Sequence, residues 1–298
     1  GFTFNGAWGM PNGEFVFFGT GDSSNALVRM DQGKNIVWEA KDLKRQSDAT
    51  PISLDDSLRI TISPDALFVL SDKELQKRSF DDGSLIGHAD LSSRLTDSVS
   101  VVYGADGNLV VPASTDRDVL VFVSPSDLSV VEEISLNTGA LSNDTLASET
   151  VISDGTILTL GDIPNVAAMD RTGALIDEYA ISEVSGTGGF EAYNLYFVIP
   201  GDTVALAFKT AGIGLGYFGA VYEFDSSNGL SGQFVGEERT GDIEGFEIDQ
   251  AGNAYRNIRF TGLQKVAVTS SGASLVWSNG DFGDGTVVTP IPHRIFGF

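Results

Sequence analysis

The stretch that decides the fold class is residues 58–88, which read LRITISPDALFVLSDKELQKRSFDDGSLIGH. Four strand-like runs in it are separated by short polar breaks: 58–62, 66–70, 75–80 and 85–88. The last break contains Asp82-Gly83, a typical hairpin turn because glycine adopts positive φ without strain. The stretch therefore predicts four consecutive antiparallel strands.

The same unit recurs along the chain, and a glycine marks the last turn of most copies. The first and last of these glycines, Gly33 and Gly272, are separated by five intervals of about 48 residues. Six such units need about 288 residues, and the chain has 298. This period predicts an all-β, six-bladed β-propeller of four-stranded antiparallel blades. A tandem of β-sandwiches and a β-helix are the alternatives, although a β-helix has much shorter coils.

We expect one propeller domain over residues 1–298. Its blades are expected at residues 5–43, 55–92, 97–137, 148–183, 190–237 and 242–280. The C-terminal tail, 281–298, carries one more strand-like segment that would join the first blade or cover the outside of the ring. The aromatic residues Phe2, Phe4 and Trp8 are expected to pair with this tail.

Charge and hydropathy exclude several classes of protein. Lys and Arg number 18 against 41 Asp and Glu, which gives a net charge of −23 and predicts no nucleic-acid partner. A hydrophobic content of 42% is enough for a real core and argues against disorder. No apolar run approaches the eighteen residues of a membrane-spanning helix, so we expect no membrane span.

The residue types needed for several chemistries are scarce or absent. The chain has no cysteine, which excludes disulfides and thiolate nucleophiles. It has two histidines, His88 and His293, without metal-ligand spacing. No Gly-x-Ser-x-Gly elbow is present to support a serine nucleophile.

Location is predicted from the start of the chain and from its composition. The sequence opens Gly1-Phe2-Thr3-Phe4 without an initiator Met, which is typical of a mature chain whose leader was removed or of an excised fragment. The acidic composition, with loops rich in Gly, Asp, Ser, Thr and Asn, suits an extracellular setting. We therefore expect a secreted or cell-surface protein.

Short motifs resemble known propeller repeats. Residues 31–39, DQGKNIVWE, resemble the Asp…Gly-Lys-x-Val-Trp turn of quinoprotein-like propellers, and residues 271–277, SGASLVW, repeat it. Residues 244–255, EGFEIDQAGNAY, resemble a strand pair of NHL-type and calcium-dependent lactonase-like propellers. These motifs specify blade turns, so the resemblance implies the fold rather than an activity.

Four carboxylates lie at or just upstream of predicted first strands, which line the central channel of a propeller: Asp97, Glu149, Glu191 and Glu244. Converging carboxylates would suit Ca²⁺, which takes six to eight oxygen ligands. They would also perturb one another's pKa and could supply a general base. The alternative is that the loops of an acidic protein are simply acidic.

Two glycine-rich loops are candidates for peripheral calcium binding through Asp22, Asp281 and Asp284. Neither loop has the spacing of an EF-hand, and ordinary turns are the alternative. A separate candidate for partner contact is the segment 210–219. It is glycine-rich and apolar, with Ile213, Leu215, Tyr217 and Phe218 as its contact residues.

The leading functional hypothesis is a non-catalytic exported or surface propeller that contacts a protein or glycan partner, including by self-association in a larger assembly. The alternative is a Ca²⁺-dependent, lactonase-like hydrolase that uses Glu244 and Glu149 of the channel. Oxidation with a quinone cofactor is a third, weaker hypothesis, because no stacking or cationic partners for the quinone are identifiable. Calcium is the one cofactor expected.

Overall fold

The computed structural model describes residues 2–9, 14–21, 25–31, 33, 35–41, 43–52, 59–141, 146–151, 154–161, 165–180, 190–191, 203–210, 217–225, 229–231, 243–248, 253–258, 262–269 and 272–279.

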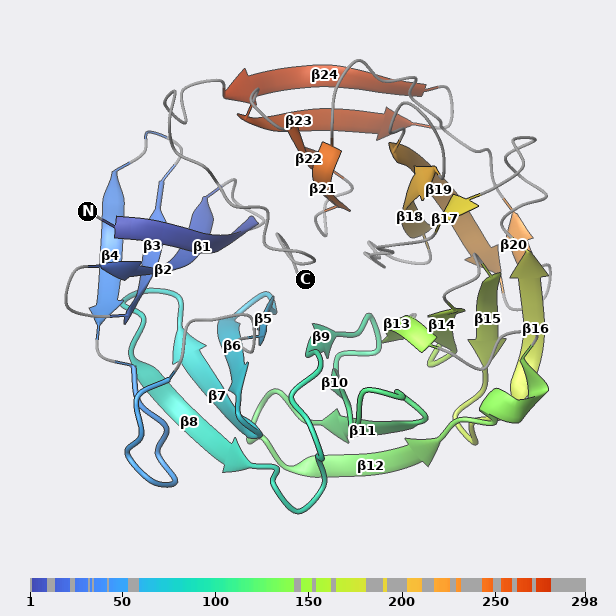
Figure 1. Cartoon of the computed structure of the whole chain (residues 1–298), viewed down its shortest axis with the longest axis horizontal. Coiled ribbons are helices and arrows are strands. Elements are labelled where there is room, and N and C mark those ends of the chain that lie inside the picture. The colour runs from blue at the N-terminus through green and yellow to red at the C-terminus, as the bar shows by residue number, and fades with distance from the viewer. Residues whose placement is uncertain are drawn as a thin grey trace. The chain divides into compact units, whose positions relative to one another are not determined.

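The described chain is all-β and consists of four-stranded antiparallel sheets, in each of which consecutive strands pair (Figure 1). Sheet 1 contains β1 (Phe2–Gly9), β2 (Phe15–Gly21), β3 (Asn25–Met30) and β4 (Ile36–Lys41). Sheet 2 contains β5 (Arg59–Ile62), β6 (Ala66–Ser71), β7 (Glu74–Ser79) and β8 (Leu85–Asp90). Sheet 3 contains β9 (Val102–Tyr103), β10 (Leu109–Pro112), β11 (Val119–Val123) and β12 (Val130–Ser135).

The second half of the chain repeats the pattern after a short 3-10 helix, η1 (Thr138–Ala140). Sheet 4 contains β13 (Leu146–Val151), β14 (Ile157–Gly161), β15 (Asn165–Met169) and β16 (Leu175–Ala180). Sheet 5 contains β17 (Phe190–Glu191), β18 (Thr203–Thr210), β19 (Tyr217–Asp225) and β20 (Gly229–Ser231). Sheet 6 contains β21 (Ile243–Ile248), β22 (Asn253–Ile258), β23 (Gly262–Thr269) and β24 (Gly272–Asn279).

Residue contacts divide the chain into two compact units. Unit 1 comprises the described residues within Gly1–Tyr103 and Gly107–Glu133, and so holds sheets 1 and 2 and most of sheet 3. Unit 2 comprises Gly104–Asp106 and Ile134–Val287, and so holds sheets 4, 5 and 6.

The opening aromatic residues belong to the first sheet. They lie in β1, which pairs with β2 as the first strand of sheet 1, and Trp8 is opposite Val16. Their alternation with small residues suits a strand paired within its own sheet. The tail with which they were expected to pair lies outside the described residues.

Burial along the strands of sheet 2 follows their position in the sheet. Every residue of β6 is buried, because both faces of this strand are covered. Its sequence, ALFVLS, is accordingly hydrophobic at every position but the last. In β8, the last strand of the sheet, half-buried and exposed residues alternate. The exposed face of β8 marks it as the outer, solvent-facing edge of the sheet.

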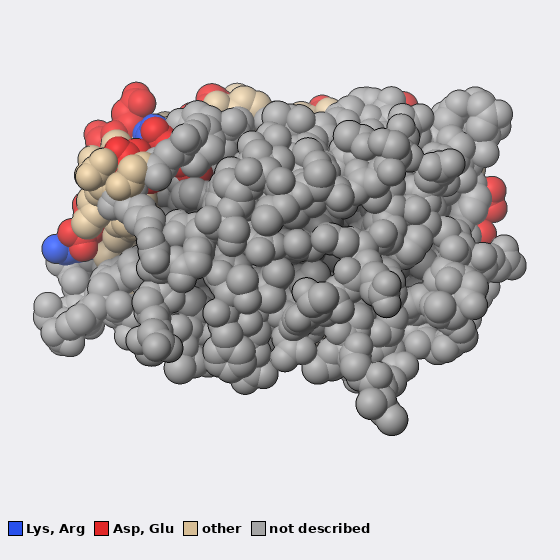
Figure 2. All heavy atoms as spheres, turned by 90° about the horizontal axis from the view of Figure 1, so that it is seen from above, with Lys and Arg blue, Asp and Glu red and all other residues tan. Residues whose placement is uncertain are grey.

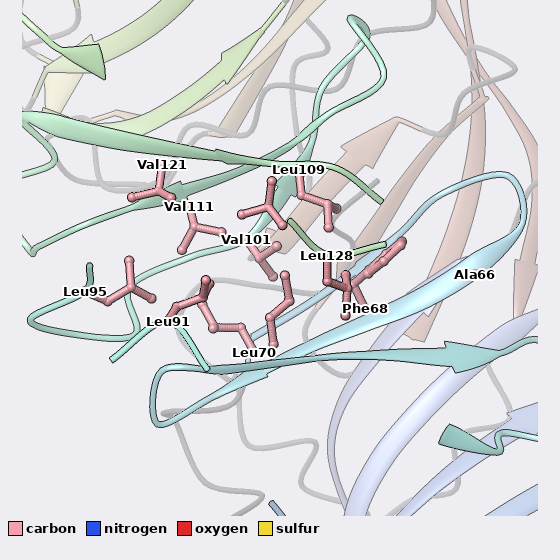
Figure 3. Packing of buried hydrophobic residues seen from close by; sticks show 12 residues of the cluster. Ala66, Phe68, Leu70, Leu91, Leu95, Val101, Leu109, Val111, Val121 and Leu128 are labelled. Atoms are coloured by element: carbon pink, nitrogen blue, oxygen red, sulfur yellow. The ribbon is translucent and has the colours of Figure 1, made fainter. Parts of the chain in front are cut away.

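Sheets 2 and 3 pack against each other through one apolar core (Figure 3). Sheet 2 contributes β6 side chains such as Phe68 and Leu70, and sheet 3 contributes Leu109, Val111 and Val121. Leu91 and Leu95 of the connection between the sheets complete the core. Burial of these side chains provides the main stabilisation of unit 1, because apolar area removed from water is the dominant favourable term in folding.

The edge between sheets 1 and 2 is closed by a tryptophan. Trp38 of β4 is buried, and its indole Nε1 donates a hydrogen bond of 2.6 Å to the carbonyl oxygen of Phe80 in the β7–β8 turn. The same carbonyl accepts a 2.5 Å bond from Nη1 of Arg29. The indole ring covers Gly83, where an added Cβ would lie 2.8 Å from two ring carbons. The tryptophan of the 31–39 motif therefore joins one sheet to the next.

The edge between sheets 2 and 3 uses the opposite arrangement. Leu128 of the β11–β12 turn is buried and reaches Gly87 of β8, where an added Cβ would lie 3.9 Å from its Cδ1. Beside it, Nζ of Lys77 donates to the carbonyl oxygen of Pro125 at 2.9 Å. Here the large side chain is on the turn and the glycine is on the outer strand.

The turns before the outer strands of sheets 2, 3 and 4 share one backbone conformation. Gly83, Leu128 and Gly173 have φ of 72°, 61° and 79°, in the left-handed region that favours glycine. The sequence predicts a turn without glycine at residues 124–127, and the structure confirms it, with Leu128 as the left-handed residue. Burial of the leucine side chain offsets the cost of that conformation.

Candidate functional site

One of the four predicted channel carboxylates is buried among described side chains. Glu149 lies in β13, the first strand of sheet 4, and is 1% exposed. Its cross-strand neighbour is Thr159 of β14, which is also 1% exposed. Directly paired residues of antiparallel strands point to the same face, so the carboxylate and the hydroxyl are neighbours. The Thr159 hydroxyl has no hydrogen-bond partner among the described residues.

The corresponding position is apolar in sheet 2. In sheet 4, Glu149 and Thr159 form the third residue pair counted from the hairpin that joins the first two strands. The same count leads to Ile60 and Val69 in sheet 2, which are both buried. Sheet 4 therefore places a carboxylate and a hydroxyl where sheet 2 has a hydrophobic pair. Burial of such groups is costly, which distinguishes this position from an ordinary acidic loop.

The other three predicted carboxylates have different positions. Asp97 is exposed in the connection between β8 and β9. Glu191 ends β17 opposite Lys209 of β18. Glu244 lies in β21 at an irregularity in the pairing with β22. Glu149, Glu191 and Glu244 thus lie within first strands rather than before them, whereas Asp97 is upstream of one.

Metal ligation by several side chains is not found in the described part of the chain. No group of three or more His, Cys, Asp or Glu residues comes close enough there to hold an ion. Glu149 and Thr159 supply at most three oxygen ligands, fewer than the six to eight that Ca²⁺ takes. The peripheral candidates Asp22, Asp281 and Asp284 lie outside the described residues.

The predicted interaction segment, 210–219, is shorter than expected. Ile213 and Leu215 lie outside the described residues. Tyr217 and Phe218 belong to β19, where they pair with Lys209 and Phe208 of β18. Aromatic residues favour strands, and here that preference extends the hairpin into the segment that the glycines marked as a loop.

A buried polar row that the sequence analysis missed runs along β7. Glu74, Gln76 and Arg78 alternate along the strand, so they share one face, and all three are buried. Oε1 of Gln76 accepts from Nε and Nη2 of Arg78 at 3.1 and 2.7 Å. Nη1 of Arg78 donates to the carbonyl oxygen of Gly83 at 3.0 Å. The sequence signal that could have predicted this row is the polar residue at every second position of β7, an inner strand of its sheet.

Glu74 fixes the connection between sheets 1 and 2. Its carboxylate accepts hydrogen bonds from the backbone N–H groups of Gln46 and Ser47 at 2.8 to 3.0 Å, and from Nε2 of Gln76 at 2.8 Å. Burial alone would raise the pKa of Glu74, but the hydrogen bonds from Gln76, Gln46 and Ser47 outweigh it and hold this pKa below its usual value. The residues 43–52 form a small hairpin closed by the Lys44–Pro51 bridge. Its tip is therefore held in one conformation by a buried charge.

The outer strands carry a repeated exposed aliphatic residue, which the sequence analysis also missed. Its exposed fraction is 45% for Val37, 57% for Ile86, 54% for Val131 and 47% for Ile176. We call these four the outer-strand aliphatic residues. In sheets 1, 2 and 4 this residue is the extra one at a shift in register, because its two neighbours pair with consecutive residues of the preceding strand.

Acidic residues lie near some of these residues in the sequence. Figure 2 shows acidic side chains on the described part of one face, with few basic ones among them. On the outer strands themselves, Glu39 follows Val37 and Glu133 follows Val131 by two residues.

No helix in the described part of the chain is long and apolar enough to cross a membrane.

Comparisons with known proteins place the fold. No protein-family model matches the chain. No curated protein matches it either. The solved structures similar to it include the β-propeller domain of Cps50 (Swd1) from Myceliophteria thermophila. The two chains are 11% identical, with a TM-score of 0.57, over 95% of this chain and 87% of that chain.

Two propeller enzymes resemble this chain with comparable identities and TM-scores. Virginiamycin B lyase from Staphylococcus aureus has 11% identity and a TM-score of 0.53, over 96% of this chain and 86% of that chain. The periplasmic gluconolactonase PpgL from Pseudomonas aeruginosa has 13% identity and a TM-score of 0.50, over 92% of this chain and 83% of that chain. Identities this low show the fold alone. The chain thus resembles β-propeller proteins in its fold, as its repeats predicted.

Proposed function

We propose that the chain is a non-catalytic, exported six-bladed β-propeller that acts by contacting a protein partner. The observation that carries this proposal is the set of outer-strand aliphatic residues, which expose a β-branched side chain at the same place in four sheets. Single exposed aliphatic residues need no explanation, but a position repeated from sheet to sheet indicates a surface.

The construction of the scaffold supports this proposal. Trp38 joins sheet 1 to sheet 2, and Leu128 contacts sheet 2 from sheet 3, so the outer strands of sheets 1 and 2 are held by packing within unit 1. A preordered surface loses little conformational entropy when it binds, which favours affinity. A protein partner fits an aliphatic surface better than a glycan does, because sugars present hydroxyl groups.

Site-specific photocrosslinking tests the proposal. A benzophenone amino acid is placed at Ile86, at Ile176 or at the exposed turn residue Ser126, and each purified variant is irradiated in an extract of the source cells. We expect the same discrete adduct from positions 86 and 176, and none from position 126. Adducts of equal yield from all three positions, or none from any, would contradict a contact through the outer strands.

A second candidate function, Ca²⁺-dependent hydrolysis of lactones, is favoured by the buried pair of Glu149 and Thr159. Glu191 and Glu244 would have to supply further ligands. The test is thermal unfolding with calcium or EDTA, combined with assays on a lactone panel. Calcium-dependent turnover that Glu149→Gln or Glu244→Gln abolishes would establish this function instead of the first.

A further inference from the structure

Three of the four outer-strand aliphatic residues are followed by an acidic residue, whereas Ile86 is followed by His88. Val37 precedes Glu39, Val131 precedes Glu133, and Ile176 precedes Glu178, each by two residues. Residues two apart in a strand lie about 6–7 Å apart on the same face. The outer strands of sheets 1, 3 and 4 therefore each carry an aliphatic residue and an acidic residue about the length of one extended lysine side chain apart.

The chain's own basic side chains already use two of these carboxylates. Nζ of Lys41 lies 2.9 Å from Oε2 of Glu39, at the surface. Nη1 of Arg94 forms an ion pair with Oε1 of Glu133. Both carboxylates are thus placed where an ammonium or guanidinium group can reach them from solvent.

The same strands are poorly suited to binding by strand addition. The register shifts at Val37 and Ile86 interrupt the regular backbone pattern of an edge strand. Such irregularities protect sheet edges against pairing with another chain. A partner would therefore contact the side chains of these strands rather than extend the sheet.

A second copy of this chain does not complement this surface. Its net charge of −23 makes the approach of two copies unfavourable, and the outer strands themselves carry carboxylates. The complementary partner is basic. Lysine and arginine can lay their methylene stems on an aliphatic side chain while the charged head reaches a carboxylate.

We propose that the outer strands bind a protein segment rich in lysine or arginine, whose stems pack on the outer-strand aliphatic residues and whose charges pair with the carboxylates beside them. This inference rests on the proposed function, because it names the partner for the same surface. Repetition of the site on several sheets would strengthen binding of a segment that reaches more than one of them.

Two labelled peptides of equal charge test the inference by fluorescence anisotropy. One is octalysine, and the other is an octamer of 2,4-diaminobutyrate, whose side chains have shorter stems, at a pH where both are fully charged. Net attraction to an acidic protein is the same for both. We expect octalysine to bind about tenfold more tightly, because the stem contributes buried apolar area.

Charge-neutral variants locate the effect. The triple variant Val37→Ser, Val131→Ser and Ile176→Ser changes the three aliphatic residues that precede a glutamate, and should bind both peptides nearly equally, with its melting temperature little changed. The control variant Ala105→Ser, Thr115→Ser and Ala140→Ser alters exposed residues elsewhere and should keep the tenfold preference. Glu39→Gln with Glu133→Gln should weaken both peptides and reduce the salt dependence of binding.

The outcomes separate the inference from the proposed function. Equal affinity of the unmodified protein for the two peptides, or an unchanged preference in the triple serine variant, would overturn the inference. Concentration-dependent dimers in sedimentation velocity, lost in the triple variant, would overturn it in favour of a second copy as partner. In either case, crosslinking from Ile86 and Ile176 but not Ser126 would still support protein contact by the outer strands.

Discussion

The edge between sheets 1 and 2 and the edge between sheets 2 and 3 solve the same packing problem in opposite ways. At the first edge, Trp38 on the outer strand covers Gly83 on the next turn. At the second, Leu128 on the turn reaches Gly87 on the outer strand. One partner is large and the other is glycine in both cases, but only Gly83 is closely covered, because an added Cβ at Gly87 would be at ordinary van der Waals distance from Leu128. Neither residue of a pair can be interpreted without the other.

The interiors of the two interfaces differ as well. Sheets 2 and 3 meet through an apolar core that includes Phe68 and Val111. On its other face, sheet 2 presents the buried row of Glu74, Gln76 and Arg78 toward the connection from sheet 1. Apolar packing tolerates small shifts, whereas a buried charge requires its particular donors. We therefore expect the first interface to be the more sensitive to single substitutions.

The largest effect is expected for Trp38→Ala. This change removes a buried indole and its hydrogen bond to Phe80, and should lower the free energy of unfolding by about 3–5 kcal/mol. Urea unfolding followed by fluorescence and by circular dichroism measures it. A loss under about 1 kcal/mol would show that the tryptophan does not join the sheets.

Glu74→Gln should be the next most damaging change. The variant keeps the shape of the side chain but replaces a charged acceptor of two backbone N–H groups with an amide, at a cost of about 2–3 kcal/mol. Because hydrogen bonds lower the pKa of Glu74, its stabilisation is present above the unfolded-state pKa and is lost as the pH falls through the folded-state pKa. The variant should therefore also lose stability less steeply in acid. An unchanged acid limb in urea unfolding would contradict this role for Glu74.

Gly83→Ala separates crowding from backbone strain. Its Cβ would lie 2.8 Å from the Trp38 ring, and its φ is 72°, so we expect a loss of about 2–3 kcal/mol. Gly107→Ala is the matched control, because its φ is 87° but nothing lies within 4 Å of the added Cβ. The control should lose only about 1 kcal/mol. Equal losses at the two positions would mean that contact with Trp38 is unimportant.

Much of the fold was predictable because turns and strands are encoded locally. Apolar runs and the glycines at positions 83 and 173 predicted the four-stranded units, and the turn around Leu128 was predicted without a glycine. The direction of the Trp38 contact was not predictable. Its partner, Gly83, is 45 residues away in sequence, and no local pattern says which glycine an indole will cover.

The candidate site was predictable in part. Position before a first strand singled out Glu149, and the structure buries it. The same rule also selected Asp97, which is exposed. Burial depends on what packs over a residue, which sequence position alone does not give. The outer-strand aliphatic residues escaped notice because exposed Val and Ile look like ordinary strand residues until pairing shows their common position.

Leu128 tests the second edge in the same way that Trp38 tests the first. Leu128→Ala loses a buried side chain while keeping a Cβ at φ 61°, and should cost about 2 kcal/mol. Leu128→Gly loses slightly more packing but relieves the left-handed strain by about 1 kcal/mol. We therefore expect the glycine variant to be as stable as the alanine variant or more so. A clearly less stable glycine variant, measured by urea unfolding, would show that the backbone conformation here is not strained.

The smallest effects are expected at the two turns, where the edges are alike. Asp82 and Asp127 occupy the same place in Ser-x-x-Asp-x-Ser sequences, at residues 79–84 and 124–129. Hydrogen bonds from Ser84 and Ser129 lower the pKa of the two carboxyls. Each contributes stability above its unfolded-state pKa and loses it as the pH falls through the lowered folded-state value. Asp82→Asn and Asp127→Asn should therefore flatten the acid limb of the stability curve slightly and equally. Unequal effects would show that the buried row of Glu74, Gln76 and Arg78 also influences the β7–β8 turn that contains Asp82.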